Sequence, residues 1–196
     1  WQEWPFDTPY LKNLVRNPDA ESGDMAGWTV TETHGEGWTP TLEDDVWTFH
    51  TSVDGFNRRT QEIDLVALGF SRQELDDAPP ILVSEHFAML EEPGLLQFTV
   101  ELFDQDHNRL ATRTTDGTDD LGQPTYARDS TSTFDTVKHL FDNYGTGLQF
   151  VTITDGGQGV ALDHAVVVVT PVNLLHDPAD QTSWQALEGT GNYSVH

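Results

Sequence analysis

The strongest constraint on the fold of this chain is an alternation of apolar and polar residues with a period of two. In the segment LQFTVEL, Leu96, Phe98, Val100 and Leu102 alternate with polar residues. A strand with one face on the core produces this pattern, because successive side chains point to opposite faces. Similar alternation occurs in the segments WTVTET, VWTFHTS, ILVSEHF and LQFVTIT.

Clusters of turn-forming residues separate these strand patterns, among them THGEG, SVDGF, FDQDHN, TTDGTDD, NYGTG and TDGGQG. The run AVVVVT is typical of a central strand that is buried on both faces. Many short strands at this spacing predict an all-β fold. We expect a two-sheet antiparallel β-sandwich of about ten strands with one short helix.

The short helix is predicted at residues 72–77. The sequence SRQE at 71–74 is a capping box, in which Ser71 caps the backbone and Glu74 reaches back. Pro79 and Pro80 follow and cannot continue a helix. We expect one sandwich over residues 13–175, an N-terminal extension over 1–12 and a C-terminal tail over 176–196. Trp residues in both end segments suggest that the ends dock on the body.

The net charge of −24, from 33 acidic and 9 basic residues, argues against two classes of partner. Such a surface repels phosphates, so we expect neither nucleic acid nor anionic lipid as partner. The absence of Cys excludes disulfides, zinc thiolate sites and a thiol nucleophile. No long apolar run or signal peptide is present, so we expect no membrane insertion, and a cytoplasmic location is favoured over secretion.

The sequence offers no catalytic motif. It lacks the G-x-S-x-G, S-x-x-K and H-E-x-x-H patterns. A pair of carboxylates at glycosidase separation is expected by chance among 33 acids. A carbohydrate-active enzyme is therefore the third hypothesis, behind two binding functions.

The segment DQDHN resembles the start of a calcium-binding EF-hand loop, with Asp104, Asp106 and Asn108 at alternate positions. That loop also needs Gly at its sixth position and Glu at its twelfth. Arg109 and Thr115 occupy these positions here. Because the segment lies between two strand patterns, a hairpin turn is predicted instead.

Aromatic residues are the richer functional signal. Between residues 28 and 56 the chain contains Trp28, Trp38, Trp47, Phe49 and Phe56. Most of these rings are expected in the core. Phe56 is the best candidate for an exposed ring, because it follows the turn residues VDG, and an exposed ring can stack on a sugar.

Three blocks of the sequence resemble the F-box-associated domain, the substrate-binding half of sugar-recognising F-box proteins. The blocks are NLVRNPDAESGDMAGW, QEIDLVALGFSRQELDDAPPILVSEHFA and FDNYGTGLQFVTITDGGQG, and the resemblance covers about residues 13–173. It implies a jelly-roll sandwich, galactose-binding-domain-like, that binds N-linked high-mannose glycans on glycoproteins through loops at one end. In this sequence no F-box is found, so binding to a ubiquitin-ligase adaptor is not expected.

The family's glycan binders use a Phe in an early loop and a Tyr-Trp-Lys run after Gly-Gly-Gln. Phe56 corresponds to the first element. The second is missing, since Val160, Ala161, Leu162 and Asp163 occupy its place. This difference keeps open an alternative function, a protein–protein interaction or scaffold domain without a sugar site.

The opening block NLVRNPDAESGDMAGWTV is also similar to the start of jelly-roll carbohydrate-binding modules, in which an early Glu and a late Asp hold a structural Ca²⁺. The corresponding residues here are Glu21 and Asp163. They make calcium a possible cofactor. Otherwise we expect NLVRNP to form the first strand and its turn, and GWTV to begin the next strand.

The resulting hypothesis is a non-enzymatic, lectin-like recognition module that binds glycans or glycoproteins. Two loops supply its candidate ligand-binding residues. Phe56 would stack on the sugar, and the neighbouring and facing polar residues would bond its hydroxyl groups. The full candidate set is Phe56, Asn57 and Arg58 from one loop, and Asp155, Gln158 and His164 from the other.

Overall fold

The computed structural model describes residues 9–90, 94–116 and 134–171. Ten strands and one helix make up this part of the chain. The elements are β1 (Thr29–Glu32), β2 (Trp38–Glu43), β3 (Val46–Thr51), β4 (Asn57–Asp64), α1 (Arg72–Asp76), β5 (Ile81–Met89), β6 (Leu95–Asp104), β7 (Arg109–Asp116), β8 (Asp135–Phe141), β9 (Leu148–Gln158) and β10 (Val160–Val169).

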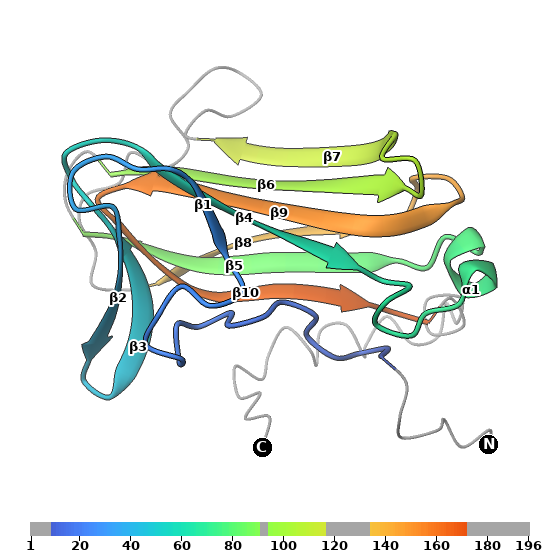
Figure 1. Cartoon of the computed structure of the whole chain (residues 1–196), viewed down its shortest axis with the longest axis horizontal. Helices are drawn as coiled ribbons and strands as arrows, with labels where there is room; N and C mark the ends of the chain where they lie inside the picture. Colours follow the sequence, from blue (N-terminus) through green and yellow to red (C-terminus); the bar gives the residue numbers. More distant parts are fainter. Residues whose placement is uncertain (1–8, 91–93, 117–133, 172–196) are drawn as a thin grey trace.

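The strands form two five-stranded antiparallel sheets. Sheet A has the order β1-β4-β9-β6-β7, and sheet B has the order β2-β3-β10-β5-β8. The longest strands of both sheets run along the length of the molecule, and α1 lies at one end (Figure 1). The predicted all-β sandwich of about ten strands with one short helix is therefore confirmed.

The core lies between the sheets and consists of the inward residues of each alternating strand. In β6 all four apolar residues of the LQFTVEL pattern are buried, namely Leu96, Phe98, Val100 and Leu102. Facing them from sheet B are buried residues such as Ile81, Val83 and Phe87. Burial of a side chain of this size stabilises the fold by about 1.5–3 kcal/mol.

Both local predictions around turns are confirmed. Helix α1 begins after the N-cap Ser71, whose hydroxyl accepts a hydrogen bond from the backbone of Glu74, while the Glu74 carboxylate bonds back to Ser71. The DQDHN segment joins β6 to β7 as a hairpin turn. In that turn Asp104 accepts hydrogen bonds from the backbone of Asp106 and Asn108, at 2.8 and 2.9 Å.

The expected first strand is instead an extended segment that lies along β10. Leu11 and Leu14 donate backbone hydrogen bonds to Val169 and Val167, at 3.1 and 2.9 Å, and Ala165 donates one to Pro18. These widely spaced bonds do not form a regular ladder, partly because Pro18 has no N–H. The predicted entry of GWTV into a strand is confirmed by β1.

The AVVVVT run lies in β10, the middle strand of sheet B. The prediction of burial on both faces is only half right. Val167 and Val169 are buried in the core, whereas Val166 and Val168 are half-buried on the outer face.

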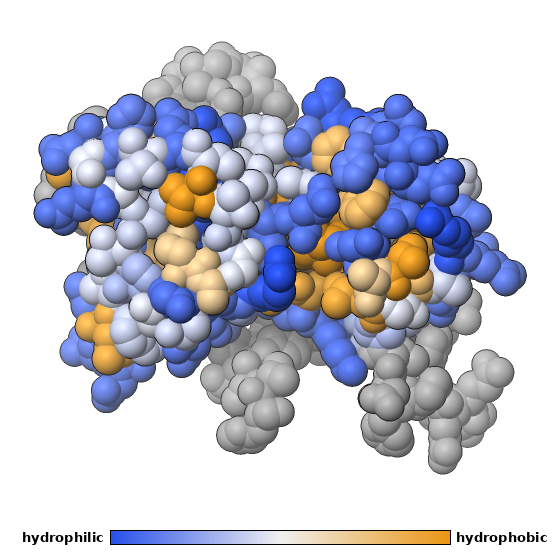
Figure 2. All heavy atoms as spheres, in the orientation of Figure 1, coloured by the Kyte–Doolittle hydropathy of each residue, from blue (hydrophilic) through white to orange (hydrophobic). Residues whose placement is uncertain are grey.

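Most of the visible surface is hydrophilic, and apolar side chains form separate groups on it (Figure 2). Among the described residues, no helix has the length and apolar character needed to cross a membrane. The expected C-terminal tail at 176–196 and most of the expected N-terminal extension lie outside the described residues.

Candidate functional site

The candidate site lies at the end of the sandwich opposite α1, where β4 begins and β9 ends (Figure 1). Phe56 is the last residue of the β3–β4 connection and is half-buried. Its ring lies over Gly156 of β9, so close that a Cβ atom there would be 2.5 Å from Phe56 Cε1. Only glycine leaves room for the ring at this position.

A charged network surrounds the Phe56 ring. The Arg58 guanidinium carbon lies 5.0 Å from the ring centroid, which is within cation–π range. Arg58 donates hydrogen bonds to Gln97 Oε1 of β6 at 3.1 Å from Nε and 2.9 Å from Nη2. Arg58 also pairs with Glu32 of β1, and His34 lies 3.2 Å from the same carboxylate. Three strands of sheet A thus contribute to one polar surface.

Two of the sequence-predicted site residues are buried instead. Asn57 has no exposed surface. Its Oδ1 accepts a hydrogen bond from the His34 backbone at 2.7 Å, and its Nδ2 donates one to Gly55 at 2.9 Å. The expected hydrogen bond from Asn57 to a sugar hydroxyl does not fit this position, because both ends of the amide hold the connecting loops together.

Asp155 is also fully buried and belongs to an ionic cluster between the sheets. It lies opposite Arg59 in the register of β9 and β4, and Arg59 Nε donates to Asp155 Oδ2 at 2.9 Å. Glu85 approaches from β5 of sheet B, 3.6 Å from Arg59. The expectation that Asp155 contacts a ligand is therefore corrected, since its partner is an internal arginine.

Ionising all three buried side chains of this cluster would cost free energy, because two carboxylates would then lie close together in the core. Burial raises the pKa of Glu85 well above its ordinary value, and the neighbouring Asp155 carboxylate raises it further. Burial also raises the pKa of Asp155, but Arg59 opposes that effect. These directions favour Glu85 as the carboxyl that holds a proton, with Arg59 and Asp155 as the ion pair.

Aromatic rings enclose the Arg59 guanidinium. Its central carbon lies 3.8 Å from the ring centroids of Trp28 and Phe49, and 4.7 Å from that of Trp38. Three of the clustered aromatic residues therefore surround a cation in the core. Because Arg59 is three residues after Phe56, this cluster anchors the start of β4 next to the candidate site.

Gln158 connects the two loops of the candidate site. Its Nε2 donates a hydrogen bond to the Val53 carbonyl at 2.8 Å, from the end of β9 to the β3–β4 connection. Gly159 alone separates β9 from β10, and Val160, Ala161 and Leu162 are buried strand residues. No aromatic ring therefore reaches the site from this connection.

His164 does not join the Phe56 group. It is exposed on the outer face of sheet B, where its ring stacks on His86 with centroids 5.6 Å apart. Its backbone N donates to Asp163 Oδ1 at 2.8 Å. A second bond, between the His164 imidazole Nδ1 and Asp163 Oδ1 at 3.4 Å, raises the pKa of His164. Burial opposes this effect, and the charges of Asp163, Asp19 and Glu21 add to it.

The predicted calcium ligands Glu21 and Asp163 therefore both lie near an imidazole. Within the described part of the chain, no group of three or more His, Asp or Glu side chains is arranged to hold a metal ion. The carboxylate of Asp163 is already bonded to His164. A shell of six or seven oxygens around Ca²⁺ would need backbone carbonyls besides these two carboxylates, so the calcium site stays a prediction.

Sequence reasoning missed Glu32, His34 and Gln97. Each lies in or beside a strand of sheet A, and their proximity to Arg58 depends on the strand order β1-β4-β9-β6. Period-two alternation places Gln97 on the outward face of its strand, and this is the one feature of the sequence that marks it as a candidate site residue. A stackable ring beside amide, carboxylate and guanidinium groups is the combination that binds polar ligands with flat apolar faces.

The fold and this end surface define a two-sheet β-sandwich that presents a mixed aromatic and polar surface on its loops. The chain belongs to the F-box associated region family, which matches residues 6–170. The family expectation from the sequence is thereby confirmed.

Two curated relatives align with most of this chain. F-box only protein 2 of Bos taurus is 29% identical over 172 residues, which is 81% of this chain and 56% of the relative. F-box only protein 6 of Rattus norvegicus is 25% identical over 159 residues, covering 75% of this chain and 54% of the relative. The chain thus spans about half the length of each.

The fold also recurs in solved structures of distant sequence. The enzymatically active domain of bacteriophage CBA120 tailspike protein 4 aligns with a TM-score of 0.55 at 16% identity. The alignment covers 83% of this chain and 22% of the tailspike chain. At this level of identity the match supports the sandwich fold.

Proposed function

We propose that this chain is a non-enzymatic recognition module that binds glycans on glycoproteins through the Phe56 end of sheet A. The observation that carries the proposal is the half-buried Phe56 ring, held between Gly156 and Arg58 at the edge of a polar surface. Membership of the F-box associated region family supports it.

Each side chain at this surface has a distinct part in the proposal. The exposed part of the half-buried Phe56 ring packs on the apolar face of a sugar ring, which contributes about 0.5–1.5 kcal/mol beyond the area buried. Arg58 and Gln97 offer N–H donors to hydroxyl groups, and Glu32 offers an acceptor. Gln158 keeps the Phe56 loop against β9 through its bond to Val53.

A glycan array tests this proposal. The wild-type chain should bind N-linked glycans, and Phe56→Ala should weaken binding about tenfold, which corresponds to about 1.4 kcal/mol. Arg16→Gln is a suitable control, because Arg16 is exposed on a different segment. An array without signal from folded wild-type protein would contradict the proposal.

The single-residue connection between β9 and β10 favours one alternative, a protein-interaction or scaffold domain. A sugar site with one ring has less stacking surface than a site with rings from two loops. If the chain is a protein-interaction domain, the Phe56 surface binds a polypeptide. Removing the glycan from a bound glycoprotein then leaves the affinity of this chain for that protein unchanged.

Calcium stays a prediction that the same array can test. Binding in the presence of EDTA should equal binding with added Ca²⁺ if Glu21 and Asp163 hold no functional ion. A loss of binding with EDTA would restore the calcium hypothesis. The cytoplasmic location likewise stays a prediction.

A further inference from the structure

A polar cavity lies at the opposite end of the sandwich from Phe56. It has a volume of about 260 Å³ and lies between α1, the β6–β7 turn and the segment before β9. Arg72, Asp76, Gln105 and Thr146 are among its lining residues. Pockets for drug-sized ligands have volumes of about 300–1,000 Å³, so this cavity suits a smaller molecule.

The polar groups of the cavity are pre-arranged across two elements. Arg72 of α1 donates from Nη1 to Gln105 Oε1 of the turn at 3.0 Å. That bond uses one of the five guanidinium N–H donors and leaves the Gln105 amide N–H₂ group to donate elsewhere. Asp76 and Thr146 add a carboxylate and a hydroxyl. The cavity therefore combines hydrogen-bond donors and acceptors.

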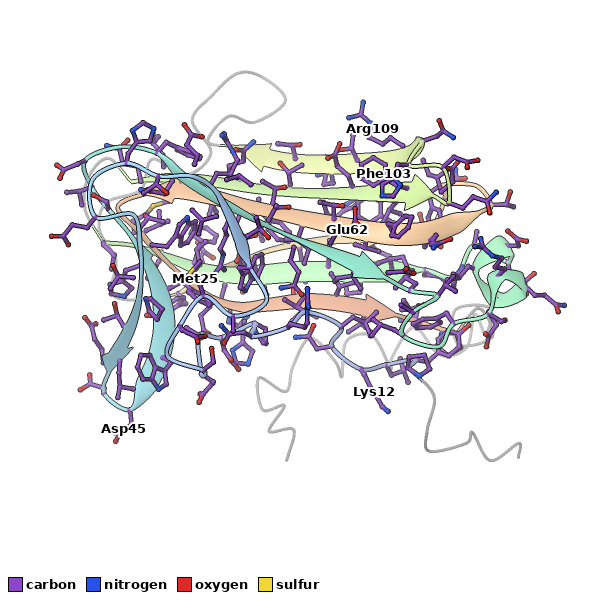
Figure 3. The ribbon with its side chains drawn as sticks, viewed as in Figure 1. Lys12, Met25, Asp45, Glu62, Phe103 and Arg109 are labelled. Carbon is purple, nitrogen blue, oxygen red and sulfur yellow. The ribbon has the colours of Figure 1, made fainter. Side chains whose placement is uncertain are left out.

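A group of three rings lies beside the cavity on the outer face of sheet A. Phe103 and Phe150 are direct neighbours in the register of β6 and β9, and the next pair, Asp104 and Leu148, lines the cavity. The His107 imidazole stacks on Phe150 with centroids 4.3 Å apart and lies 6.2 Å from Phe103. Figure 3 labels Phe103 toward this end of the sandwich.

The His107 ring of this group is accessible to a ligand. The His107 side chain is 54% exposed, so the ring face that does not contact Phe150 is open to solvent. Its Nε2 lies 3.3 Å from Glu62 Oε2, which holds the orientation of the ring. An open, fixed ring next to a polar cavity is suited to a ligand with both an apolar face and several hydroxyl groups.

The charged groups of the site do not favour binding of a metal ion or a phosphate. One guanidinium and the Asp76 and Asp104 carboxylates line the cavity. Both oxygens of Asp104 already accept hydrogen bonds from Asp106 or Asn108, so Asp104 serves the turn. The described residues offer no metal-binding group of three or more ligands. The chain charge of −24 also repels phosphates.

We propose that this cavity and the adjacent His107 ring form a second saccharide-binding site, specific for a neutral pyranoside. One sugar ring stacks on the His107 imidazole, and the next enters the cavity, where Arg72, Asp76 and Gln105 bond its hydroxyl groups. This site shares no residue with the Phe56 surface, so the two sites are independent of each other. A glycan or glycoprotein with two suitable branches can then be held at both ends of the sandwich.

The test is an NMR titration of the ¹⁵N-labelled chain with cellotriose, mannotriose and chitotriose, each in turn. We expect saturable shifts of the Gln105 side-chain amide and the Thr146 and Gly147 backbone amides with at least one trisaccharide. Arg72→Gln and His107→Asn should each weaken that binding about tenfold or more, or about 1.4 kcal/mol. Asn is chosen because position 107 has a φ of 57°, which Asn tolerates.

Two controls separate this site from the first. Arg16→Gln makes the same charge change as Arg72→Gln on another exposed segment, and it should leave the cavity shifts unchanged. Phe56→Ala should also leave them unchanged, even if it abolishes glycan binding at the other end. The second-site proposal is overturned if no trisaccharide gives saturable cavity shifts, if inorganic phosphate or calcium chloride alone saturates them, or if only Phe56→Ala removes them.

Discussion

Arg59 and Asp155 form a fully buried ion pair with 2.9 Å between Nε and Oδ2, directly across the β4–β9 register. Arg59 is the third residue of β4, the strand that begins after Phe56, and Glu85 joins the pair from the other sheet. A buried ion pair rarely adds net stability to a fold. Removal of one partner nevertheless lowers the free energy of unfolding, because it leaves an unpaired buried charge. This cluster therefore fixes how the two sheets and the Phe56 loop are aligned.

The first prediction concerns the coupling between the two buried carboxyls. In Asp155→Asn or Glu85→Gln alone, the remaining carboxyl can ionise beside Arg59 and keep a neutral pair. In the double variant the arginine has no anion, and we expect the free energy of unfolding to fall by about 3–5 kcal/mol. Urea denaturation of all four proteins measures this. If the double variant loses no more free energy of unfolding than the two single variants together, the two carboxyls do not substitute for each other as partner of Arg59.

The second prediction is the pH dependence that Glu85 contributes. Its pKa is raised in the folded state above the ordinary value of 4.5. Protonated Glu85 therefore makes its full contribution to the free energy of unfolding below pH 4.5. This contribution is lost as the pH rises toward the pKa of Glu85 in the folded state. Glu85→Gln lacks this loss, so its stability relative to wild type should increase as pH rises above 4.5. A constant difference over pH 4–9, measured by urea denaturation, would exclude a protonated Glu85.

The third prediction uses two adjacent glycines of β9. A Cβ on Gly156 would be 2.5 Å from Phe56 Cε1, whereas one on Gly157 would be 2.2 Å from Val160 Cγ2. Gly156→Ala should displace the Phe56 ring and weaken glycan binding, with a modest loss of stability. Gly157→Ala should destabilise the core by about 1–3 kcal/mol and spare the ring. Equal effects of both substitutions on glycan binding would argue against a special role for the ring.

The fourth prediction concerns the cap of α1. Ser71→Ala removes the side-chain bond to the Glu74 backbone and should lower the free energy of unfolding by about 1 kcal/mol. Ser71→Asn should retain most of the wild-type stability, because Asn is an equally good cap. Chemical denaturation compares the three proteins, and an unchanged midpoint in Ser71→Ala would show that tertiary packing alone holds the helix.

Much of the fold could be predicted from the sequence, because the signals are local. The alternation in LQFTVEL reports which residues of β6 face the core, and SRQE marks the start of α1. The extended N-terminal segment was harder, since its backbone bonds go to β10, about 150 residues away in sequence.

The candidate site was only partly predictable. Asp155 was expected on a loop because Gly156 and Gly157 follow it, a local turn signal. In the structure these glycines continue β9, since one makes room for Phe56 and the other for Val160. The contacts of Arg58 with Glu32 and Gln97 depend on the pairing of three strands, which a single sequence does not reveal.

The most direct test of the central proposal is a calorimetric titration of this chain with a glycoprotein that carries one high-mannose N-glycan, before and after enzymatic removal of that glycan. We predict that wild type binds only the glycosylated form and that Phe56→Ala weakens this binding about tenfold. Equal affinity of wild type for both forms, or wild-type affinity in Phe56→Ala, would contradict glycan recognition at the Phe56 end.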